Sequence, residues 1–313
     1  MPNPIYSTLK AAYRKLHYAM RRTVSALGWE VYPSRDFYSP IPVLKELEQT
    51  RSQWDVPSEM VGVTYDVEPM KILLKELVDL YGTEFRALAP YRENKKLGLG
   101  PGFTEVDAMT LYFMIRHIKP KRYIEIGSGF STYYAWMAVN KNREEGVETS
   151  FRVIDPYPRE ALKRLENIDL TISPVQDVNL AYFDELEAGD VFFIDTSHVL
   201  KLGGEVAYLY LEVVPRLKPG ITIHAHDIHF PYNVPHPAEQ YVFGTKWPQV
   251  WTESMILQAF LAFNSDFRIT FSAPLLRHFD HDFLKATVPD YRPTIPADYD
   301  THFGSLWFER FRG

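Results

Sequence analysis

The fold is decided by the stretch Lys121-Arg-Tyr-Ile-Glu-Ile-Gly-Ser-Gly-Phe-Ser-Thr-Tyr-Tyr-Ala-Trp136. An apolar run breaks at two glycines and resumes at helical spacing, which predicts a strand, a tight turn and a helix. Gly127 and Gly129 allow the backbone to turn at positive φ and to approach a ligand closely, and Ser131 stands where the helix begins. This turn, with Glu125 at the end of its strand, predicts a site for a nucleotide-like cofactor.

The same alternation continues along the chain. Short apolar runs predict strands at 151–155, 170–175, 190–195, 221–225, 267–271 and 305–311, and amphipathic stretches predict helices at 133–139, 159–166, 206–217 and 255–263. This pattern is typical of an α/β, Rossmann-like, doubly wound and mostly parallel sheet, which binds ligands at the carboxyl ends of its strands.

The part of the chain before this domain is expected to be an appendage. We predict a helical and extended arm or lid over residues 1–100 and a cofactor-binding catalytic domain over residues 101–313. Prolines and aromatic residues at 33–69 predict an ordered, extended arm, and a helix follows from Glu68 to Pro90. Thr104-Glu-Val-Asp107 has the pattern of a capping box and predicts a helix through Ile118.

The first 35 residues are basic. Glu30 is their single acid, set against Lys10, Arg14, Lys15, Arg21, Arg22 and Arg35. The segment lacks the apolar centre of a signal peptide. Two interpretations stay open: a solvated amphipathic helix that packs on the body or joins subunits into a homo-oligomer, or a surface for a membrane or an acidic partner.

Composition narrows the class of protein. The 313 residues include no cysteine, which excludes disulfides and thiolate sites and favours a cytoplasmic location. A net charge of −6 disfavours nucleic acid as a partner, and no apolar run predicts a transmembrane segment. We therefore expect the partner to be a small molecule.

Three acids end predicted strands: Glu125, Asp155 and Asp195. A nicotinamide dinucleotide fits the turn poorly, because the third glycine of its fingerprint is replaced by Thr132 and Asp155 lies farther on than the about 20 residues typical of that motif. Glu125 would also repel a pyrophosphate, whereas its charge suits a cationic amino-acid group.

At this point the residues carry a resemblance to a known family. Glu125-Ile-Gly-Ser-Gly-Phe-Ser-Thr132 resembles the first motif of class I S-adenosylmethionine-dependent methyltransferases, and Arg216-Leu-Lys-Pro-Gly220 resembles the turn before the fifth strand. Over residues 37–311 the chain is similar to a bacterial branch of uncharacterised small-molecule methyltransferases, through Phe193-Ile-Asp-Thr-Ser-His198, His226-Asp-Ile228 and Trp251-Thr-Glu-Ser-Met-Ile-Leu-Gln-Ala-Phe-Leu261.

The resemblance implies S-adenosylmethionine as cofactor. It implies that Asp155 binds the ribose hydroxyls and that Val175-Gln-Asp177 lies beside the adenine. The predicted cofactor site consists of Glu125, Gly127, Ser128, Gly129, Ser131, Asp155, Gln176, Asp177 and Asp195.

Methyl transfer to a hydroxyl needs a group that removes its proton, and polar residues gather at the ends of the predicted fourth and fifth strands. They are Asp195, His198, His224, His226, Asp227 and His229. We predict His198, Asp195 and Asp227 as catalytic residues, with His198 as the base because imidazole titrates near neutral pH. His198 has an alternative role as a cap of the following loop.

A metal site is a competing prediction at the same place. Catechol-type O-methyltransferases bind a divalent ion with acids at the ends of these strands, which implies Asp195, His226 and Asp227 as ligands. A histidine in this set favours a softer ion than magnesium. The alternative is that His226 packs in the core and donates to a backbone carbonyl, while Asp227 orients the substrate.

Other residues enter only as candidates for the pocket. His278-Phe-Asp-His281-Asp282 offers further possible metal ligands, but it is expected to be a solvated or substrate-facing loop. Glu253 is expected to face the pocket. Five aromatic residues either line a pocket for a ring-shaped acceptor or belong to the core: Tyr38, Tyr232, Tyr241, Trp247 and Trp251.

The sequence thus predicts a methyltransferase that uses S-adenosylmethionine to methylate a hydroxyl of a small molecule such as a sugar or secondary metabolite. A divalent metal ion as a helper of this reaction is the accompanying hypothesis. Two alternatives remain. One is a metal-dependent hydrolase or oxygenase built on the histidines, and the other is a non-catalytic cofactor-binding partner.

Overall fold

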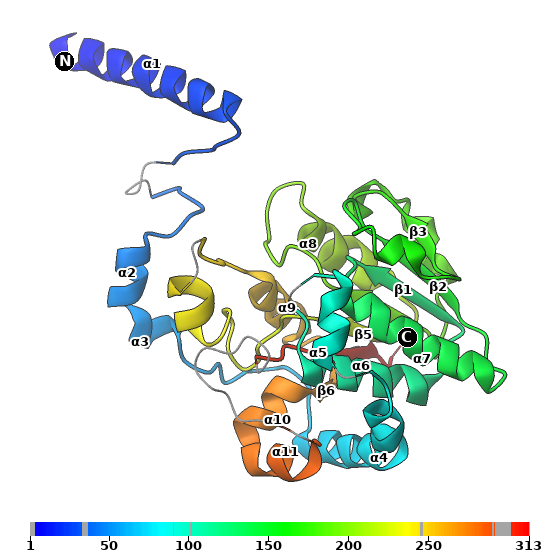
Figure 1. The fold of residues 1–313 in the computed structure, drawn as a ribbon. Coiled ribbons are helices and arrows are strands. Elements are labelled where there is room, and N and C mark those ends of the chain that lie inside the picture. The colour runs from blue at the N-terminus through cyan, green and yellow to red at the C-terminus, as the bar shows by residue number, and fades with distance from the viewer. Residues whose placement is uncertain are drawn as a thin grey trace. The chain divides into compact units, whose positions relative to one another are not determined.

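The computed structural model describes residues 4–32, 37–89, 91–100, 102–244, 247–289, 291 and 302–312. The chain divides into two compact units, Met1–Trp54 and Asp55–Gly313, and each is described by itself (Figure 1). The second unit includes residues 55–100, which were assigned to the arm on sequence grounds. Among the described residues, no helix is both long enough and apolar enough to cross a bilayer.

The first unit is helical. Its elements are α1 (Pro4–Ala26), α2 (Leu44–Gln49) and α3 (Arg51–Trp54). The indole Nε1 of Trp54 donates to the carbonyl of Leu47 over 2.9 Å and so ties α3 to α2. The helix predicted for the basic N-terminus is confirmed, whereas the arm predicted as extended contains two short helices; residues 33–36 of that arm lie outside the described residues.

The second unit is built on a seven-stranded sheet in the order β3-β2-β1-β4-β5-β7-β6. β1 to β5 are parallel, and β7 runs antiparallel to both of its neighbours. The predicted Rossmann-like, mostly parallel fold is confirmed. The strands are β1 (Arg122–Ile126), β2 (Ser150–Ile154), β3 (Asp169–Thr171), β4 (Val191–Ile194), β5 (Thr222–Ala225), β6 (Phe267–Ser272) and β7 (Leu306–Arg310).

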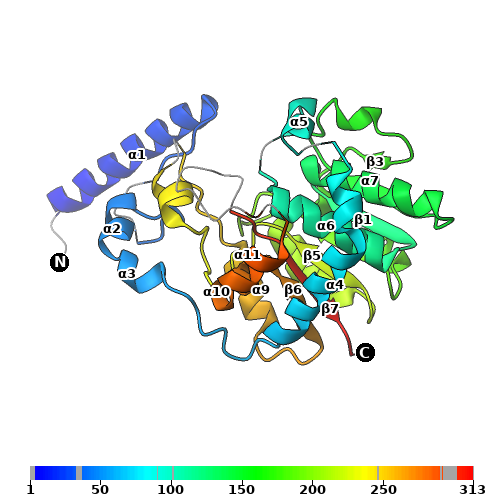
Figure 2. The same ribbon diagram turned by 60° about the horizontal axis from the view of Figure 1, so that its bottom comes forward.

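Helices cover both faces of this sheet (Figures 1 and 2). α4 packs on α6, and α6 on α7. The helical stretch that begins at α8 continues as a π turn, Leu209–Val213, and a 3-10 turn, Val214–Arg216. The helices are α4 (Val67–Arg86), α5 (Tyr91–Asn94), α6 (Glu105–Ile118), α7 (Phe130–Glu144), α8 (Glu205–Tyr208), α9 (Glu253–Leu261), α10 (Ala273–Phe279) and α11 (His281–Thr287), with a further π turn at Glu239–Phe243.

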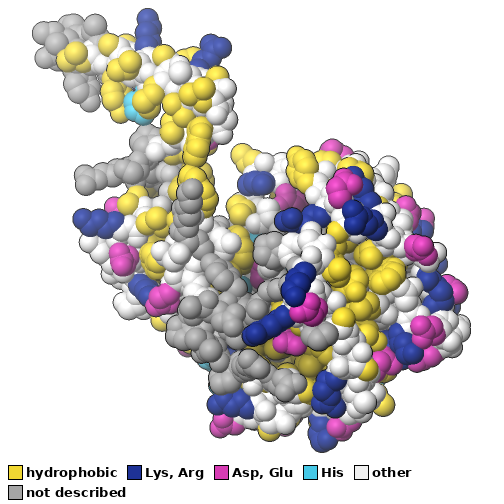
Figure 3. All heavy atoms as spheres, in the orientation of Figure 1, with side chains coloured by type: hydrophobic (Ala, Val, Ile, Leu, Met, Phe, Trp, Pro, Cys, Tyr) yellow, Lys and Arg dark blue, Asp and Glu magenta, His cyan; other side chains and the backbone are white. Residues whose placement is uncertain are grey.

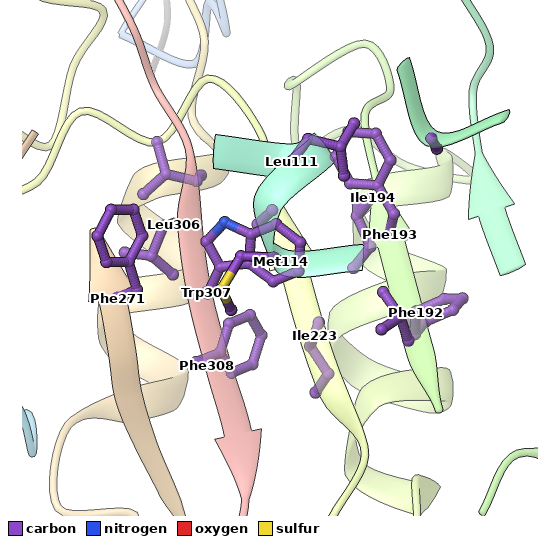
Figure 4. Packing of buried hydrophobic residues seen from close by; sticks show 14 of the residues in the cluster. Leu111, Met114, Phe192, Phe193, Ile194, Ile223, Phe271, Leu306, Trp307 and Phe308 are labelled. Atoms are coloured by element: carbon purple, nitrogen blue, oxygen red, sulfur yellow. The ribbon is translucent and has the colours of Figure 1, made fainter. Parts of the chain in front are cut away.

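The core lies between the sheet and these helices. β4 is buried along its whole length, as expected for a central parallel strand. Figure 4 shows Met114 of α6 in front of Trp307, and Leu111 of the same helix in front of Ile194 and Phe193. Large aromatic side chains that are fully buried dominate this core, and each stabilises the fold by roughly 1.5–3 kcal/mol relative to an exposed one.

A buried ion-pair network joins α4, α6 and α7. Arg116 of α6 is 3% exposed, and its Nε lies 2.7 Å from Oε1 of Glu84 on α4. Its other guanidinium nitrogens bond to Asn142 and to Glu145 at the end of α7. The same Glu84 oxygen accepts the hydroxyl of Tyr112 over 2.7 Å. This network ties α4 to α6 and α7 within the second unit.

Besides the arm, other predicted elements differ from the structure, among them the strand predicted at 170–175, which is β3 and ends at Thr171. The helix predicted at 159–166 is only a 3-10 turn at Leu162–Arg164, because Leu162 is the one buried residue of that segment and provides no apolar stripe to pack on the sheet. The loop predicted at 278–282 instead spans the end of α10 and the start of α11, where Asp280 accepts the amide of Phe283 over 3.0 Å as an N-cap.

Candidate functional site

The glycine turn after β1 brings the backbones of β1 and β4 together. Gly127 has φ +83°, and a Cβ added there would lie 1.7 Å from the carbonyl oxygen of Asp195. Only glycine fits this position. Gly129 was also predicted to need positive φ; its φ of 173° is extended backbone, so that prediction was wrong.

Glu125 is hydrogen-bonded to residues that follow this turn. Its side chain has no exposed surface; one carboxylate oxygen accepts the hydroxyls of Ser131 over 2.7 Å and Thr132 over 2.9 Å, and the other accepts Tyr123 over 3.2 Å. Thr132 also accepts the amide of Gly129 over 3.0 Å, which explains a threonine where a dinucleotide fingerprint has glycine. Burial outweighs these hydrogen bonds and raises the pKa of Glu125 to about 8.

The other predicted cofactor residues follow the neighbouring strands. Asp155 comes directly after β2, where it accepts the amide of Tyr157 over 2.7 Å and the hydroxyl of Ser128 from the glycine turn. Gln176 and Asp177 lie exposed on a 3-10 turn after β3. Because β3, β2, β1 and β4 are adjacent and parallel, all these positions follow one edge of the sheet.

Four polar side chains converge next along that edge, at the ends of β4 and β5. Nε2 of His198 lies 3.4 Å from Oδ1 of Asp195 and 3.4 Å from Oδ2 of Asp227. Nδ1 of His226 lies 3.5 Å from Asp195 and 3.7 Å from Asp227. We call these four residues the Asp-His cluster. Both histidines are buried, whereas the side chain of Asp195 is 27% exposed.

Each histidine of the cluster has a further carboxylate beside the ring nitrogen that points away from the cluster. Glu253 on α9, 1% exposed, lies 2.8 Å from Nδ1 of His198 and accepts the hydroxyl of Tyr210 over 2.7 Å. Asp107 on α6 lies 3.3 Å from Nε2 of His226. Asp107 also accepts the amides of Gly304 and Ser305, over 3.1 and 3.0 Å, and so joins α6 to the start of β7.

These contacts set the charges of the cluster. Burial disfavours a charged imidazole, but the hydrogen bonds of His198 to Asp195 and Glu253 outweigh it and raise its pKa to about 10. The surrounding carboxylates likewise overcome burial and raise the pKa of His226 well above its usual value. Burial raises the pKa of Asp227 to about 6, whereas the two histidines hold the pKa of Asp195 well below its usual range despite burial.

The backbone at the cluster is strained. His198 has φ +61° and Asp227 has φ +57°, in the left-handed region of backbone conformation that residues other than glycine rarely adopt. The carbonyl of His198 accepts the amides of Thr252 and Glu253, over 2.8 and 3.1 Å, which fixes the loop to α9. Strain that the surroundings hold in place is found most often at functional sites.

The structure brings some of the candidate metal ligands together. Among the described residues, Asp195, His198 and Asp227 have ligand atoms that all lie within 4.8 Å of one another. This set contains His198 where the sequence suggested His226. His226 packs against the ring of Phe103 at 4.6 Å, and carboxylates lie beside its ring nitrogens. Within the described part of the chain, neither nitrogen bonds to the backbone carbonyl considered as an alternative.

Two other histidines singled out from the sequence have different surroundings. His224 lies between the rings of Phe193 and Trp307, at 4.2 and 4.0 Å, so it is a core residue. His281 is on α11 with its Nε2 3.1 Å from the hydroxyl of Tyr291. Neither residue has an atom in the Asp-His cluster.

Some of the aromatic candidates lie beside the cluster and some do not. Trp251 lies 4.7 Å from His198, ring to ring, and Tyr241 lies 5.3 Å from Trp251. Tyr232 stacks on His236 at 3.6 Å. Trp247 is exposed, and Tyr38 is exposed in the first unit.

Sequence reasoning missed Asp107 as a site residue. Its local pattern indicates a capping box, and the structure has one: the hydroxyl of Thr104 accepts the amide of Asp107 over 3.1 Å, and the carboxylate of Asp107 accepts the amide of Thr104 over 3.4 Å. The sign of a further role is its complete burial, which an acid that only caps a helix does not need, and that burial is seen only in the folded structure.

Comparisons with known proteins agree with the sheet and its glycine turn. Residues 124–228 match the family model of a methyltransferase domain. An uncharacterized protein of Archaeoglobus fulgidus is 29% identical over 201 residues, which cover 60% of this chain and 88% of that protein.

Two solved structures are more distantly similar. The O-methyltransferase TomG from Streptomyces achromogenes, involved in tomaymycin synthesis and solved with SAM, is 12% identical with a TM-score of 0.39, covering 80% of this chain and 92% of that one. An O-methyltransferase from Bacillus cereus in complex with SAH is 12% identical with a TM-score of 0.37, covering 86% and 100%. These similarities are too weak to bear on the substrate.

Proposed function

We propose that this chain is a class I S-adenosylmethionine-dependent methyltransferase that methylates a hydroxyl group of a small molecule. S-Adenosylmethionine supplies an electrophilic methyl group, so the protein must hold the acceptor oxygen in line with it and remove the proton. The observation that carries the proposal is the convergence of Asp195, His198 and Asp227 on the sheet edge beside the turn of Gly127.

The residues present fit the cofactor. Gly127 lets the backbone turn sharply against the carbonyl of Asp195, and Asp155 and Ser128 offer carboxylate and hydroxyl oxygens to the ribose at the end of β2. Glu125 has no exposed surface and acts on the cofactor site by holding the turn through Ser131 and Thr132. Asp195, a member of the Asp-His cluster, also adjoins this turn, because its carbonyl lies against Gly127.

The charges of the cluster bear on the choice of base. With its pKa raised to about 10, His198 carries a proton at neutral pH and cannot accept one from the acceptor hydroxyl. Asp227, with a pKa of about 6, is largely ionised there and accepts a proton more readily. In this form of the site, Asp227 is the better candidate for the base and His198 a donor that orients the acceptor oxygen.

A divalent ion is the second component that we propose. Asp195, His198 and Asp227 would hold it, with Glu253 orienting the ring of His198 through Nδ1 in the manner of a carboxylate–histidine pair behind a metal. The ion would supply charge that lowers the pKa of an acceptor hydroxyl. Binding would displace the proton of His198, so metal affinity should rise with pH. A mixed oxygen and nitrogen ligand set favours Mn²⁺ or Zn²⁺ over Mg²⁺.

The cofactor and the metal can be tested separately. S-Adenosylhomocysteine should raise the melting temperature of the metal-stripped protein, and Asp155→Asn should remove that shift while leaving Mn²⁺ binding intact. His198→Gln should abolish Mn²⁺ binding in calorimetry and leave the shift with S-adenosylhomocysteine, and His281→Gln serves as the matched control. No shift in the wild type contradicts the cofactor; a shift without metal binding contradicts only the metal.

The acceptor class is tested by product analysis. Incubation with S-adenosylmethionine and a panel of hydroxylated small molecules should give products heavier by one methylene, with the methyl group on oxygen. A methyl group on nitrogen or carbon would refute O-methylation. Turnover of the panel without S-adenosylmethionine would favour a hydrolase or oxygenase, and cofactor binding without turnover of any acceptor would favour a non-catalytic partner.

A further inference from the structure

The first unit carries a helix whose side chains divide into an apolar and a basic side. Leu9, Tyr13, Leu16 and Met20 follow the helical spacing of one face of α1, and they are 64%, 61%, 72% and 45% exposed. Figure 3 shows hydrophobic side chains gathered along this helix, with Lys and Arg side chains projecting from its other edge. Four large apolar side chains in a row are more than scattered surface residues.

The basic side has one sign of charge. Arg14, Lys15, Arg21 and Arg22 are exposed, and residues 4–26 contain no aspartate or glutamate. The whole chain has a net charge of −6, so the helix is opposite in sign to the rest of the molecule. Outside the helix, Glu30 lies 3.6 Å from Arg21.

This charge distribution decides between the possible occupants of the apolar face. Two copies of α1 packed through their apolar faces would leave both rows of cations outside the contact, without an acid on either helix to offset them. An anionic surface would instead attract the basic side while the apolar side is buried. Aromatic side chains with polar ends, which prefer a membrane interface, also flank the basic residues: Arg22 lies over the ring of Tyr18 at 6.0 Å, and Arg21 over that of Tyr32 at 5.5 Å.

We propose that α1 binds the surface of a membrane that contains anionic lipid and lies in its interfacial plane. Leu9, Tyr13, Leu16 and Met20 enter the acyl boundary, while the arginines and lysine reach the headgroups, as in other amphipathic helices of this composition. The helix attaches to the surface and does not span it. This proposal does not depend on the reaction that the second unit catalyses.

The test uses the full chain and vesicles of two compositions. The protein should sediment with vesicles of phosphatidylcholine that contain about a third phosphatidylserine, bind pure phosphatidylcholine vesicles far more weakly, and be released at high salt. Each basic residue at an anionic surface contributes about fivefold to binding, so Arg14→Gln with Lys15→Gln should weaken it by about 25-fold.

Variants of the apolar face complete the test. Leu16→Asp should abolish sedimentation, whereas Leu202→Asp, at a fully exposed leucine of the second unit, should leave it unchanged. An unchanged melting curve shows that Leu16→Asp leaves the catalytic unit folded. The proposal is overturned if the wild type does not bind the phosphatidylserine vesicles, if it binds both compositions equally, or if Leu16→Asp still binds. A wild-type dimer that Leu16→Asp converts to a monomer, without vesicle binding, would assign the face to a second copy of the chain.

Discussion

Replacing Glu125 by glutamine should remove a pH dependence from the stability of the catalytic unit. Ser131 and Thr132 donate to one oxygen of the Glu125 carboxylate and favour its ionised form. The complete burial of the group favours the neutral form and outweighs them, so that its folded-state pKa is about 8. Glutamine has the shape of the neutral carboxyl and can accept the same two hydroxyls, but it does not titrate.

The sign and size of the effect follow from linkage. In the unfolded chain the carboxyl titrates at its ordinary pKa of 4.5, so between 4.5 and about 8 the folded protein binds a proton that the unfolded chain has released. The stability contributed by the neutral carboxyl is therefore complete below pH 4.5 and is lost as the pH rises through 8. Between pH 5 and pH 9 the loss amounts to about 4 kcal/mol.

Urea unfolding of the cofactor-free proteins, followed by circular dichroism at both pH values, measures this loss. At pH 5 the wild type and Glu125→Gln should have nearly equal free energies of unfolding, and at pH 9 the variant should be more stable by about 4 kcal/mol. Other titrating groups affect both proteins alike and cancel in the difference. A difference that is the same at both pH values, or a wild type that gains on the variant as the pH rises, would refute the argument that burial dominates at Glu125.

Two further substitutions test the packing around the site. Gly127→Ala places a Cβ against the carbonyl of Asp195. It should destabilise the protein by more than about 3 kcal/mol and abolish the melting shift with S-adenosylhomocysteine. The control Gly146→Ala, at a similar φ of +87° but in open space, should cost about 1 kcal/mol and keep the shift. Equal effects of the two alanines would contradict the role of the close approach. Arg116→Met leaves its glutamate partners without the buried cation and should cost about 3–5 kcal/mol in urea unfolding, whereas Lys119→Met, at a half-exposed pair, should cost less than about 1 kcal/mol.

The elements that sequence patterns predicted well are those whose burial is uniform. β4 reads as a continuous apolar run because both of its faces are covered, and α6 begins at the predicted capping box. The patterns failed where few residues touch the core, as at the 3-10 turn Leu162–Arg164. They also failed where a polar cap starts a helix without an apolar stripe, as at Asp280.

The sequence by itself determined the fold class and the edge of the sheet that carries the site. Parallel strands end at one edge, so acids that follow such strands, among them Asp155 and Asp195, must lie along it wherever the helices pack. Only the tertiary structure decided which partners these residues have. Asp107 and Glu253 reach the two histidines from α6 and α9, and no local pattern predicts contacts between elements so far apart in the chain. The charge of His198 depends on these contacts as well, because its pKa reflects the balance between burial and carboxylates on several elements, and that balance exists only in the packed protein.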